Sequence, residues 1–125
     1  MKLLIVDDSN IMRRAIEKYL QNNKFTLVGM APDGEAAMQL FRKHLPDLVT
    51  LDITMAKMDG LSCLEQMLKI KPDTKILIIS ALKDPATGLQ ALKKGARGFL
   101  TKPFTAAQLQ KEIEEVLGGG AYDGK

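Results

Sequence analysis

The sequence LLIVDD at residues 3–8, near the start of the chain, is the clearest indication of the fold. Four consecutive apolar residues followed at once by two aspartates are typical of a strand that is covered on both faces and ends at a polar edge. Strands of this kind occur in parallel sheets, where helices lie over both sides. The stretch therefore predicts an α/β domain with acidic groups at the carboxyl end of its first strand.

Four further apolar runs lie downstream, at residues 25–29, 48–51, 76–79 and 98–100. Apolar residues at helical spacing separate them, which indicates amphipathic helices between the strands. These stripes are Met12, Ile16 and Leu20 with Ile11, Ala15 and Tyr19 beside them; Ala37, Leu40, Phe41 and His44; Leu61, Leu64 and Leu68; and Leu109, Ile113, Val116 and Leu117. Strand and helix alternate five times, which predicts a flavodoxin-like (βα)5 fold with parallel strand order 2-1-3-4-5.

Turn and cap residues support these boundaries. Asp33-Gly34 opens the second helix, Asp84-Pro85 opens the fourth, which Gly95 closes, and Thr105 with Gln108 forms a capping box for the last. Gly118 is a helix stop. We therefore expect one domain over residues 1–118 and a loose glycine-rich tail over residues 119–125.

Length and composition exclude several classes of protein. A chain of 125 residues is sufficient for one domain, and its single cysteine excludes a disulfide framework. No apolar run is long enough for a signal peptide or a membrane span, so we expect a cytoplasmic protein. The net charge of +3 is spread along the chain, and tryptophan is absent, so nucleic-acid binding is not expected.

Three acidic residues stand where strands are predicted to end. Asp7 and Asp8 follow the first apolar run, and Asp52 follows the third. Strand order 2-1-3-4-5 makes these two strands neighbours, so the three carboxylates meet in one cleft. Crowded carboxylates either take up protons or bind a cation, and oxygen ligands without His or Cys favour Mg²⁺.

Two more polar residues belong to the same edge. Ser80 ends the fourth run and Lys102 follows the fifth. A hydroxyl, an ammonium and a metal around one carboxylate make a place for a phosphoryl group. Asp52 is the candidate nucleophile, since a carboxylate can form an aspartyl phosphate.

These residues stand in motifs that resemble the receiver domains of two-component response regulators. The motifs are Leu4-Ile5-Val6-Asp7-Asp8-Ser9, Leu51-Asp52-Ile53-Thr54-Met55, Ile79-Ser80-Ala81 and Lys102-Pro103-Phe104, within a likeness that runs from about Lys2 to Leu117. The run from Asp7 to Arg14, without an output domain, is similar to the stand-alone chemotaxis type within that family.

The resemblance implies a role for each site residue. Asp52 accepts a phosphoryl group from a phosphohistidine of a sensor histidine kinase. Asp8 and Asp52 ligate Mg²⁺, Asp7 acts mainly through water, and the backbone carbonyl of Thr54 completes the ligands. Ser80 and Lys102 hold the phosphoryl oxygens, and the Lys102-Pro103 peptide is expected to be cis.

The resemblance also implies a switch. Ser80 and the aromatic Phe99, where many receivers have Tyr, couple phosphorylation to a partner-binding surface over residues 84–117. Many receivers have Pro where this chain has Ala56, which leaves the rigidity of that loop open. The residues two positions after the acceptor and the hydroxyl residue, Thr54 and Leu82, are implied to tune dephosphorylation.

The implied partners are a kinase and a downstream target protein. The flagellar motor switch is the favoured target, and a phosphatase is a further candidate. A phosphorelay intermediate or a regulator outside chemotaxis is the alternative. A small phosphatase with an Asp nucleophile fits less well, because Thr54 stands where a second acid is needed. A flavodoxin-like carrier also fits less well, because Asp7 and Asp8 repel phosphate.

The remaining reactive residues have structural interpretations. His44 suits the end of the second helix, where a cation complements the dipole, and Cys63 reads as a small buried thiol of the third helix. Met55 and Met58 flank the acceptor loop and are minor candidates for partner contact. For Arg13 and Arg14, an exposed helix face and a kinase-facing side are equally good interpretations.

Overall fold

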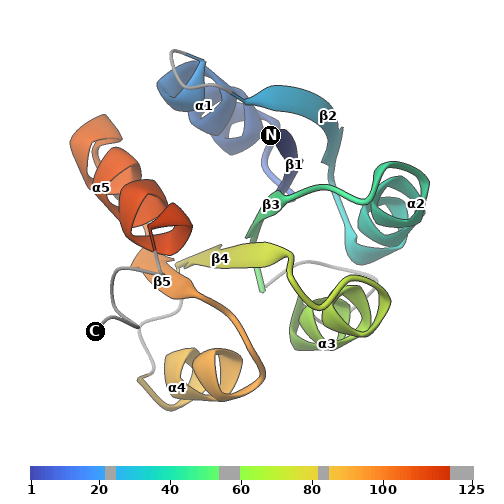
Figure 1. Cartoon of the computed structure of the whole chain (residues 1–125). Coiled ribbons are helices and arrows are strands. Elements are labelled where there is room, and N and C mark those ends of the chain that lie inside the picture. The colour runs from blue at the N-terminus through green and yellow to red at the C-terminus, as the bar shows by residue number, and fades with distance from the viewer. Residues whose placement is uncertain (22–24, 54–59, 82–84, 119–125) are drawn as a thin grey trace.

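The computed structural model describes residues 1–21, 25–53, 60–81 and 85–118. Strands and helices alternate five times along the chain, as the sequence predicts (Figure 1). In order they are β1 (Lys2–Val6), α1 (Asn10–Leu20), β2 (Thr26–Ala31), α2 (Gly34–His44), β3 (Leu48–Leu51), α3 (Gly60–Ile70), β4 (Lys75–Ser80), α4 (Pro85–Lys93), β5 (Gly98–Thr101) and α5 (Ala106–Leu117).

All five strands form one parallel sheet in the order β2-β1-β3-β4-β5, which confirms the predicted flavodoxin-like topology. The chain leaves β1 toward one edge for β2 and returns past it for β3. The strand order therefore reverses between β1 and β3, and ligands of such sheets bind beyond the carboxyl ends of the strands at this point.

Successive side chains of β1 point to opposite faces of the sheet and enter two different cores. Leu3 and Ile5 pack with residues of α1 and α5, whereas Leu4 and Val6 pack with residues of α2, α3 and α4. Figure 1 shows the same division, with α1 and α5 on one side of the sheet and the other helices opposite. Burial on both faces explains why β1, β3 and β4 read as continuous apolar runs.

Two sequence predictions differ from the structure in detail. β2 spans Thr26–Ala31 instead of residues 25–29, because a register shift against β1 lets Ala31 pair with Val6. Ile11, which we expected beside the apolar stripe of α1, is 81% exposed. The side of α1 with Ile16 and Leu20 is buried. Ile11 does not share their spacing of four residues, so its side chain points to solvent.

The predicted helix boundaries are confirmed where the structure describes them. The Asp33 carboxylate accepts a hydrogen bond from the Ala36 amide at the start of α2, and Thr105 with Gln108 forms the capping box of α5. Gly118 is the C-cap residue of α5, and Gly95, with φ of 113°, follows α4. Asp84 and the tail at residues 119–125 lie outside the described residues.

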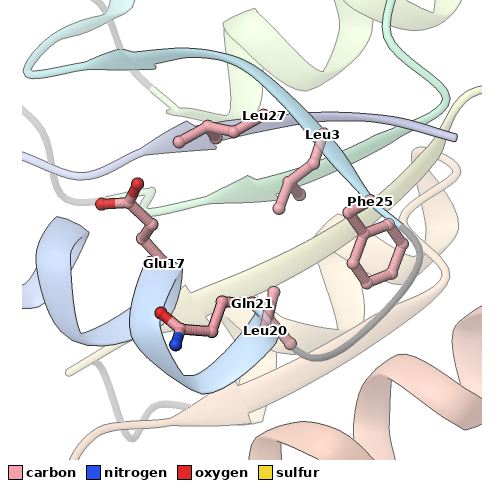
Figure 2. Close-up of a pocket in the computed structure, with 6 residues that line it drawn as sticks. All are labelled: Leu3, Glu17, Leu20, Gln21, Phe25 and Leu27. Atoms are coloured by element: carbon pink, nitrogen blue, oxygen red, sulfur yellow. The ribbon is translucent and has the colours of Figure 1, made fainter.

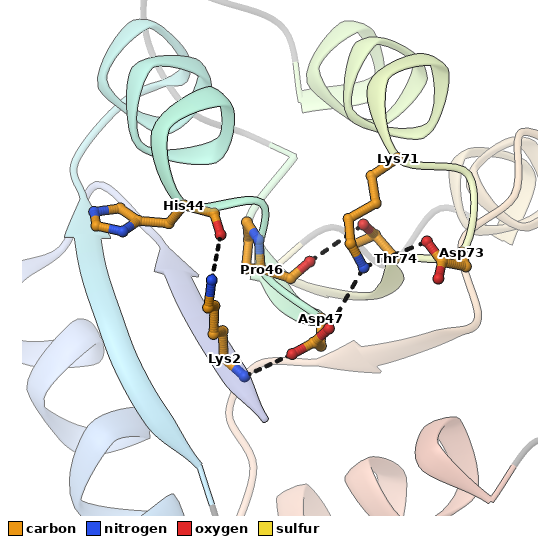
Figure 3. A network of polar contacts seen from close by, with 7 residues as sticks. All are labelled: Lys2, His44, Pro46, Asp47, Lys71, Asp73 and Thr74. Atoms are coloured by element: carbon orange, nitrogen blue, oxygen red, sulfur yellow. Dashed lines mark hydrogen bonds and ion pairs between the residues drawn. The ribbon is translucent and has the colours of Figure 1, made fainter.

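A polar network ties three connections together at the amino ends of the strands (Figure 3). Asp47, just before β3, accepts a hydrogen bond from the Lys2 backbone amide (2.8 Å). Its carboxylate also forms an ion pair with Lys71 (3.4 Å). The Thr74 hydroxyl donates to the Pro46 carbonyl (3.3 Å), and Lys71 also contacts Asp73 (3.3 Å). This network connects segments at the amino ends of the strands, whereas the predicted cleft of Asp7, Asp8 and Asp52 lies at their carboxyl ends.

In the part of the chain that the structure describes, no helix has the length and apolar character that a membrane span requires.

Candidate functional site

Backbone hydrogen bonds continue the sheet one residue beyond three of the strand ends. The Asp52 amide donates to the Val6 carbonyl (3.0 Å), and the Lys102 amide donates to the Ser80 carbonyl (2.9 Å). The Asp7 amide donates to the Ala31 carbonyl (3.0 Å) on the other side of β1. These bonds fix the backbones of the polar residues at the carboxyl edge of the sheet.

Three aspartates meet at this edge, as the sequence predicts. Asp7, Asp8 and Asp52 each offer a carboxylate oxygen, and these oxygens lie within 4.8 Å of one another. Asp7 and Asp52 are buried, whereas Asp8 is exposed. The cluster is therefore buried on the side of Asp7 and Asp52 and open to solvent at Asp8, where a group from outside the protein can approach it.

The ammonium of Lys102 lies between the two buried carboxylates. Its Nζ atom is 2.7 Å from Asp7 Oδ2 and 3.2 Å from Asp52 Oδ2. Burial alone would lower the pKa of Lys102, but the attraction of Asp7 and Asp52 outweighs it, so this pKa lies above its ordinary value. Lys102 therefore stays charged wherever the two carboxylates are ionised. The Lys102–Pro103 peptide bond is cis, as predicted.

The pKa of Asp7 lies above its ordinary value. Burial raises the pKa of Asp7, and hydrogen bonds from Lys102 and from the Ser9 amide (2.9 Å) only partly oppose it. The cluster of three carboxylates thus has one ammonium, which contacts two of them. A divalent cation balances this charge, and a set of carboxylate oxygens is the donor chemistry that Mg²⁺ prefers, so the residues present fit that metal.

The two predicted switch residues lie on neighbouring strands. Ser80 is fully buried at the end of β4, where it pairs with Thr101 of β5. Phe99 pairs with Ile78 and is half-buried against the core under α4. A methyl group added to Gly88 of α4 would lie 3.4 Å from the Phe99 ring, so helix and ring face each other closely.

Part of the predicted site lies outside the described residues. This holds for Thr54, whose carbonyl the resemblance assigns to the metal, and for Leu82. The minor candidates Met55 and Met58, together with Ala56, fall in the same ranges.

Two residues near the cleft carry contacts that the sequence analysis did not assign. The Ser9 hydroxyl caps α1 by accepting from the Met12 amide (3.2 Å). Arg13 donates from Nη1 to the Asp7 backbone carbonyl (2.6 Å). A serine directly before a helical stripe was a readable signal for the cap, whereas the contact of Arg13 depends on how α1 packs.

The other reactive residues lie away from the cleft. His44 is in the last turn of α2, and Cys63 is a buried residue of α3, both as predicted. A separate pocket of about 160 Å³ lies between the end of α1 and the starts of β1 and β2, lined by Leu3, Glu17, Leu20, Gln21, Phe25 and Leu27 (Figure 2). Its lining includes none of the clustered aspartates.

Comparison with known proteins places this arrangement in a family. The sequence model of the response regulator receiver domain matches residues 3–114. The chemotaxis protein CheY of Bacillus subtilis (strain 168) is 37% identical over 116 residues, which is 93% of this chain and 97% of that protein. The transcriptional regulatory protein DegU of Brevibacillus brevis is 33% identical over 97% of this chain, but the chain spans only 52% of its length.

A solved structure agrees with these sequence matches. The crystal structure of the CheX–CheY–BeF3–Mg²⁺ complex from Borrelia burgdorferi contains a chain that is 34% identical, with a TM-score of 0.89. The match covers 94% of this chain and 89% of that one.

Proposed function

This chain belongs to the response regulator receiver domain family, and we propose that it is a switch in which Asp52 accepts a phosphoryl group and alters a partner-binding surface. Receiver domains are signalling modules of two-component systems and not conventional enzymes. The observation that carries the proposal is the contact of buried Asp52 with Lys102 inside a three-aspartate cluster. Family membership also displaces the phosphatase and flavodoxin alternatives.

Asp52 is the nucleophile. One of its carboxylate oxygens attacks the phosphorus of a phosphohistidine on a sensor kinase, and an acyl phosphate forms as the phosphorus–nitrogen bond breaks. The bonding electron pair leaves with the imidazole nitrogen. Asp52 is buried beside the Lys102 ammonium, which restricts its carboxylate before the donor arrives and supports this assignment.

Asp8 and Asp52 are the proposed direct ligands of Mg²⁺, with Asp7 holding ordered water and Thr54 contributing its carbonyl. The metal, when bound, neutralises phosphoryl oxygens during transfer. Lys102, which contacts both buried carboxylates in the unphosphorylated protein, is in place to transfer one contact to a phosphoryl oxygen. The ammonium thus remains paired before and after the reaction.

Ser80 and Phe99 carry the change to the surface. A phosphoryl group on Asp52 adds about 1.5–2 negative charges and three acceptor oxygens, and the Ser80 hydroxyl donates to one of them. The movement of Ser80 vacates space beside β5, and Phe99 turns from its half-buried position into that space. The altered surface comprises α4, β5 and α5.

The proposed partners are a sensor histidine kinase as phosphodonor and a target protein for the altered surface. The match to CheY over nearly the full length of both chains supports a role in chemotaxis. For that role we propose the flagellar motor switch as target and a phosphatase as a further partner. The match to DegU supports the alternative of a regulator outside chemotaxis, and a phosphorelay intermediate is a further alternative. We place the protein in the cytoplasm, with residues 1–118 as the receiver unit.

The test separates phosphorylation from switching. Wild type, Asp52→Asn and Ser80→Ala are incubated with acetyl phosphate and Mg²⁺, and the gain in mass is compared with amide NMR shifts at Leu89, Phe99 and Leu109. We expect no mass gain in Asp52→Asn. In Ser80→Ala we expect a mass gain with reduced NMR shifts.

Asp73→Asn is the control, because Asp73 belongs to the network at the amino ends of the strands. It should behave as wild type. Full labelling of Asp52→Asn, or wild-type shifts in Ser80→Ala, would contradict the corresponding half of the proposal.

A further inference from the structure

Arg13 contacts the acidic cleft through a backbone carbonyl, whereas Lys102 contacts carboxylates. It stands in the first turns of α1 and is half-buried, and its Nη1 atom donates to the backbone carbonyl of Asp7 at 2.6 Å. Its Nη2 atom donates to Asn10 Oδ1 at 3.3 Å. The guanidinium therefore touches no carboxylate of the cluster in these bonds but binds the peptide between Asp7 and Asp8.

The segment that bears Asp8 is held at both of its ends. On one side the Arg13 guanidinium fixes the Asp7 carbonyl. On the other side the Ser9 amide donates to Asp7 Oδ1 (2.9 Å), and the Ser9 hydroxyl caps α1. Asp8 itself is exposed, so its direction depends on the backbone that carries it.

We propose that Arg13 is a positioning residue for the Mg²⁺ site, and that its bond to the Asp7 carbonyl holds the Asp8 carboxylate toward Asp7 and Asp52. This inference rests on the proposed function, since it assigns a role relative to the metal. A charge-assisted hydrogen bond to a backbone carbonyl is among the stronger polar contacts. Groups that orient metal ligands in this way contribute substantially to metal affinity.

The sign of the effect distinguishes positioning from bulk electrostatics. A positive charge near a cation site repels the cation, so removal of Arg13 as a mere charge would tighten Mg²⁺ binding. Removal of Arg13 as a positioning group would weaken it, because Asp8 would lose its fixed direction. The neighbouring Arg14 is exposed and supplies a matched control of the same charge.

The experiment is a calorimetric Mg²⁺ titration of wild type, Arg13→Ala, Arg13→Lys and Arg14→Ala. We expect the Kd of Arg13→Ala to rise about ten-fold, the Kd of Arg13→Lys to lie between those of wild type and Arg13→Ala, and Arg14→Ala to bind as tightly as wild type or slightly tighter. A second readout needs no metal: amide hydrogen exchange at Asp8 and Ser9 should be faster in Arg13→Ala than in Arg14→Ala.

Each outcome decides a different claim. If wild type binds Mg²⁺ and Arg13→Ala binds equally or more tightly, the positioning role is wrong while the metal site stands. If wild type binds no Mg²⁺, the proposed metal site fails and the inference fails with it. If Arg13→Ala does not fold, Arg13→Met replaces it, since Met fills similar space without an N–H donor. Binding by Arg13→Met at or above wild-type affinity would overturn the inference.

Discussion

At the residue scale, Lys102 determines the charge balance of the cleft. It is the ammonium shared by Asp7 and Asp52, and only 16% of its side chain is exposed. A second pair has the same 2.7 Å separation, between Lys94 and Glu65, but those side chains are 36% and 47% exposed. The two pairs thus differ in burial and not in distance, which makes them a matched comparison.

We predict that Lys102→Met lowers the free energy of unfolding of the metal-free protein by about 3 kcal/mol, because it leaves buried carboxylates without their partner. Mg²⁺ should restore most of the loss, since the cation replaces the missing positive charge. Lys94→Met should change stability little, because solvent screens an exposed pair. Urea unfolding with and without Mg²⁺ measures these differences. Equal effects of the two substitutions would show that burial does not govern the Lys102 contacts.

At the element scale, α4 is held on the sheet by small residues. Its buried positions include Gly88 and Ala91, whereas its large residues Leu89 and Leu92 are 53% and 45% exposed. Glycine in a helix interior costs about 1 kcal/mol relative to alanine. α4 is therefore a marginal element next to Phe99, and such an element can change its packing when the site changes.

Gly88→Ala should raise the free energy of unfolding by about 0.5–1 kcal/mol, since the added methyl group reaches only ordinary contact distance from Phe99. Gly60→Ala is the contrasting variant, because its methyl group would overlap the backbone of Ile53. It should be strongly destabilised. Denaturant unfolding of both proteins measures the effects. Destabilisation of Gly88→Ala would mean that α4 packs against β5 too tightly to accept a methyl group.

The network at the amino ends of the strands gives stability a pH dependence. The Lys2 backbone amide, with a smaller contribution from Lys71, lowers the pKa of Asp47 below its ordinary value. A lowered folded-state pKa stabilises the protein above the ordinary value near pH 4, and this stabilisation is lost as the pH falls through the folded-state pKa.

Asp47→Asn should therefore be less stable than wild type at pH 6, and the difference should be smaller at pH 3, which lies below the ordinary pKa of an aspartate. Urea unfolding at the two pH values measures the difference. Asp73→Asn is the control, because it removes a carboxylate from Lys71 without removing the bond to the Lys2 amide. A difference that is independent of pH would mean that the charge of Asp47 does not stabilise the fold.

At the scale of the whole molecule, most of the fold could be predicted because local pattern and tertiary packing agree. The runs in β1, β3 and β4 are apolar without interruption, since both cores cover them. The limits of β2 are not predictable from its residues alone, because β2 lies at the edge of the sheet and its limits depend on pairing with β1. The exposure of Ile11 is not predictable either, because an apolar residue beside a stripe need not face the core.

The cleft could be predicted because its residues stand at strand ends. Topology alone brings their backbones to one edge of the sheet; these residues are Asp7, Asp52, Ser80 and Lys102. Arg13 could not be predicted, because its bond to a carbonyl depends on the position of α1 on the sheet and on the path of a long side chain. A pair such as Arg13 and Arg14 looks alike in sequence, yet one is half-buried and the other exposed.

Chemical identification of the phosphorylated residue tests whether Asp52 is the phosphoacceptor. The protein is incubated with acetyl phosphate and Mg²⁺, reduced with borohydride, which converts an aspartyl phosphate to homoserine, and analysed by peptide mass spectrometry. We expect homoserine at position 52 alone, and none when Mg²⁺ or acetyl phosphate is omitted. Homoserine at position 7 or 8 with Asp52 unchanged, or no homoserine at all, would show that Asp52 is not the phosphoacceptor.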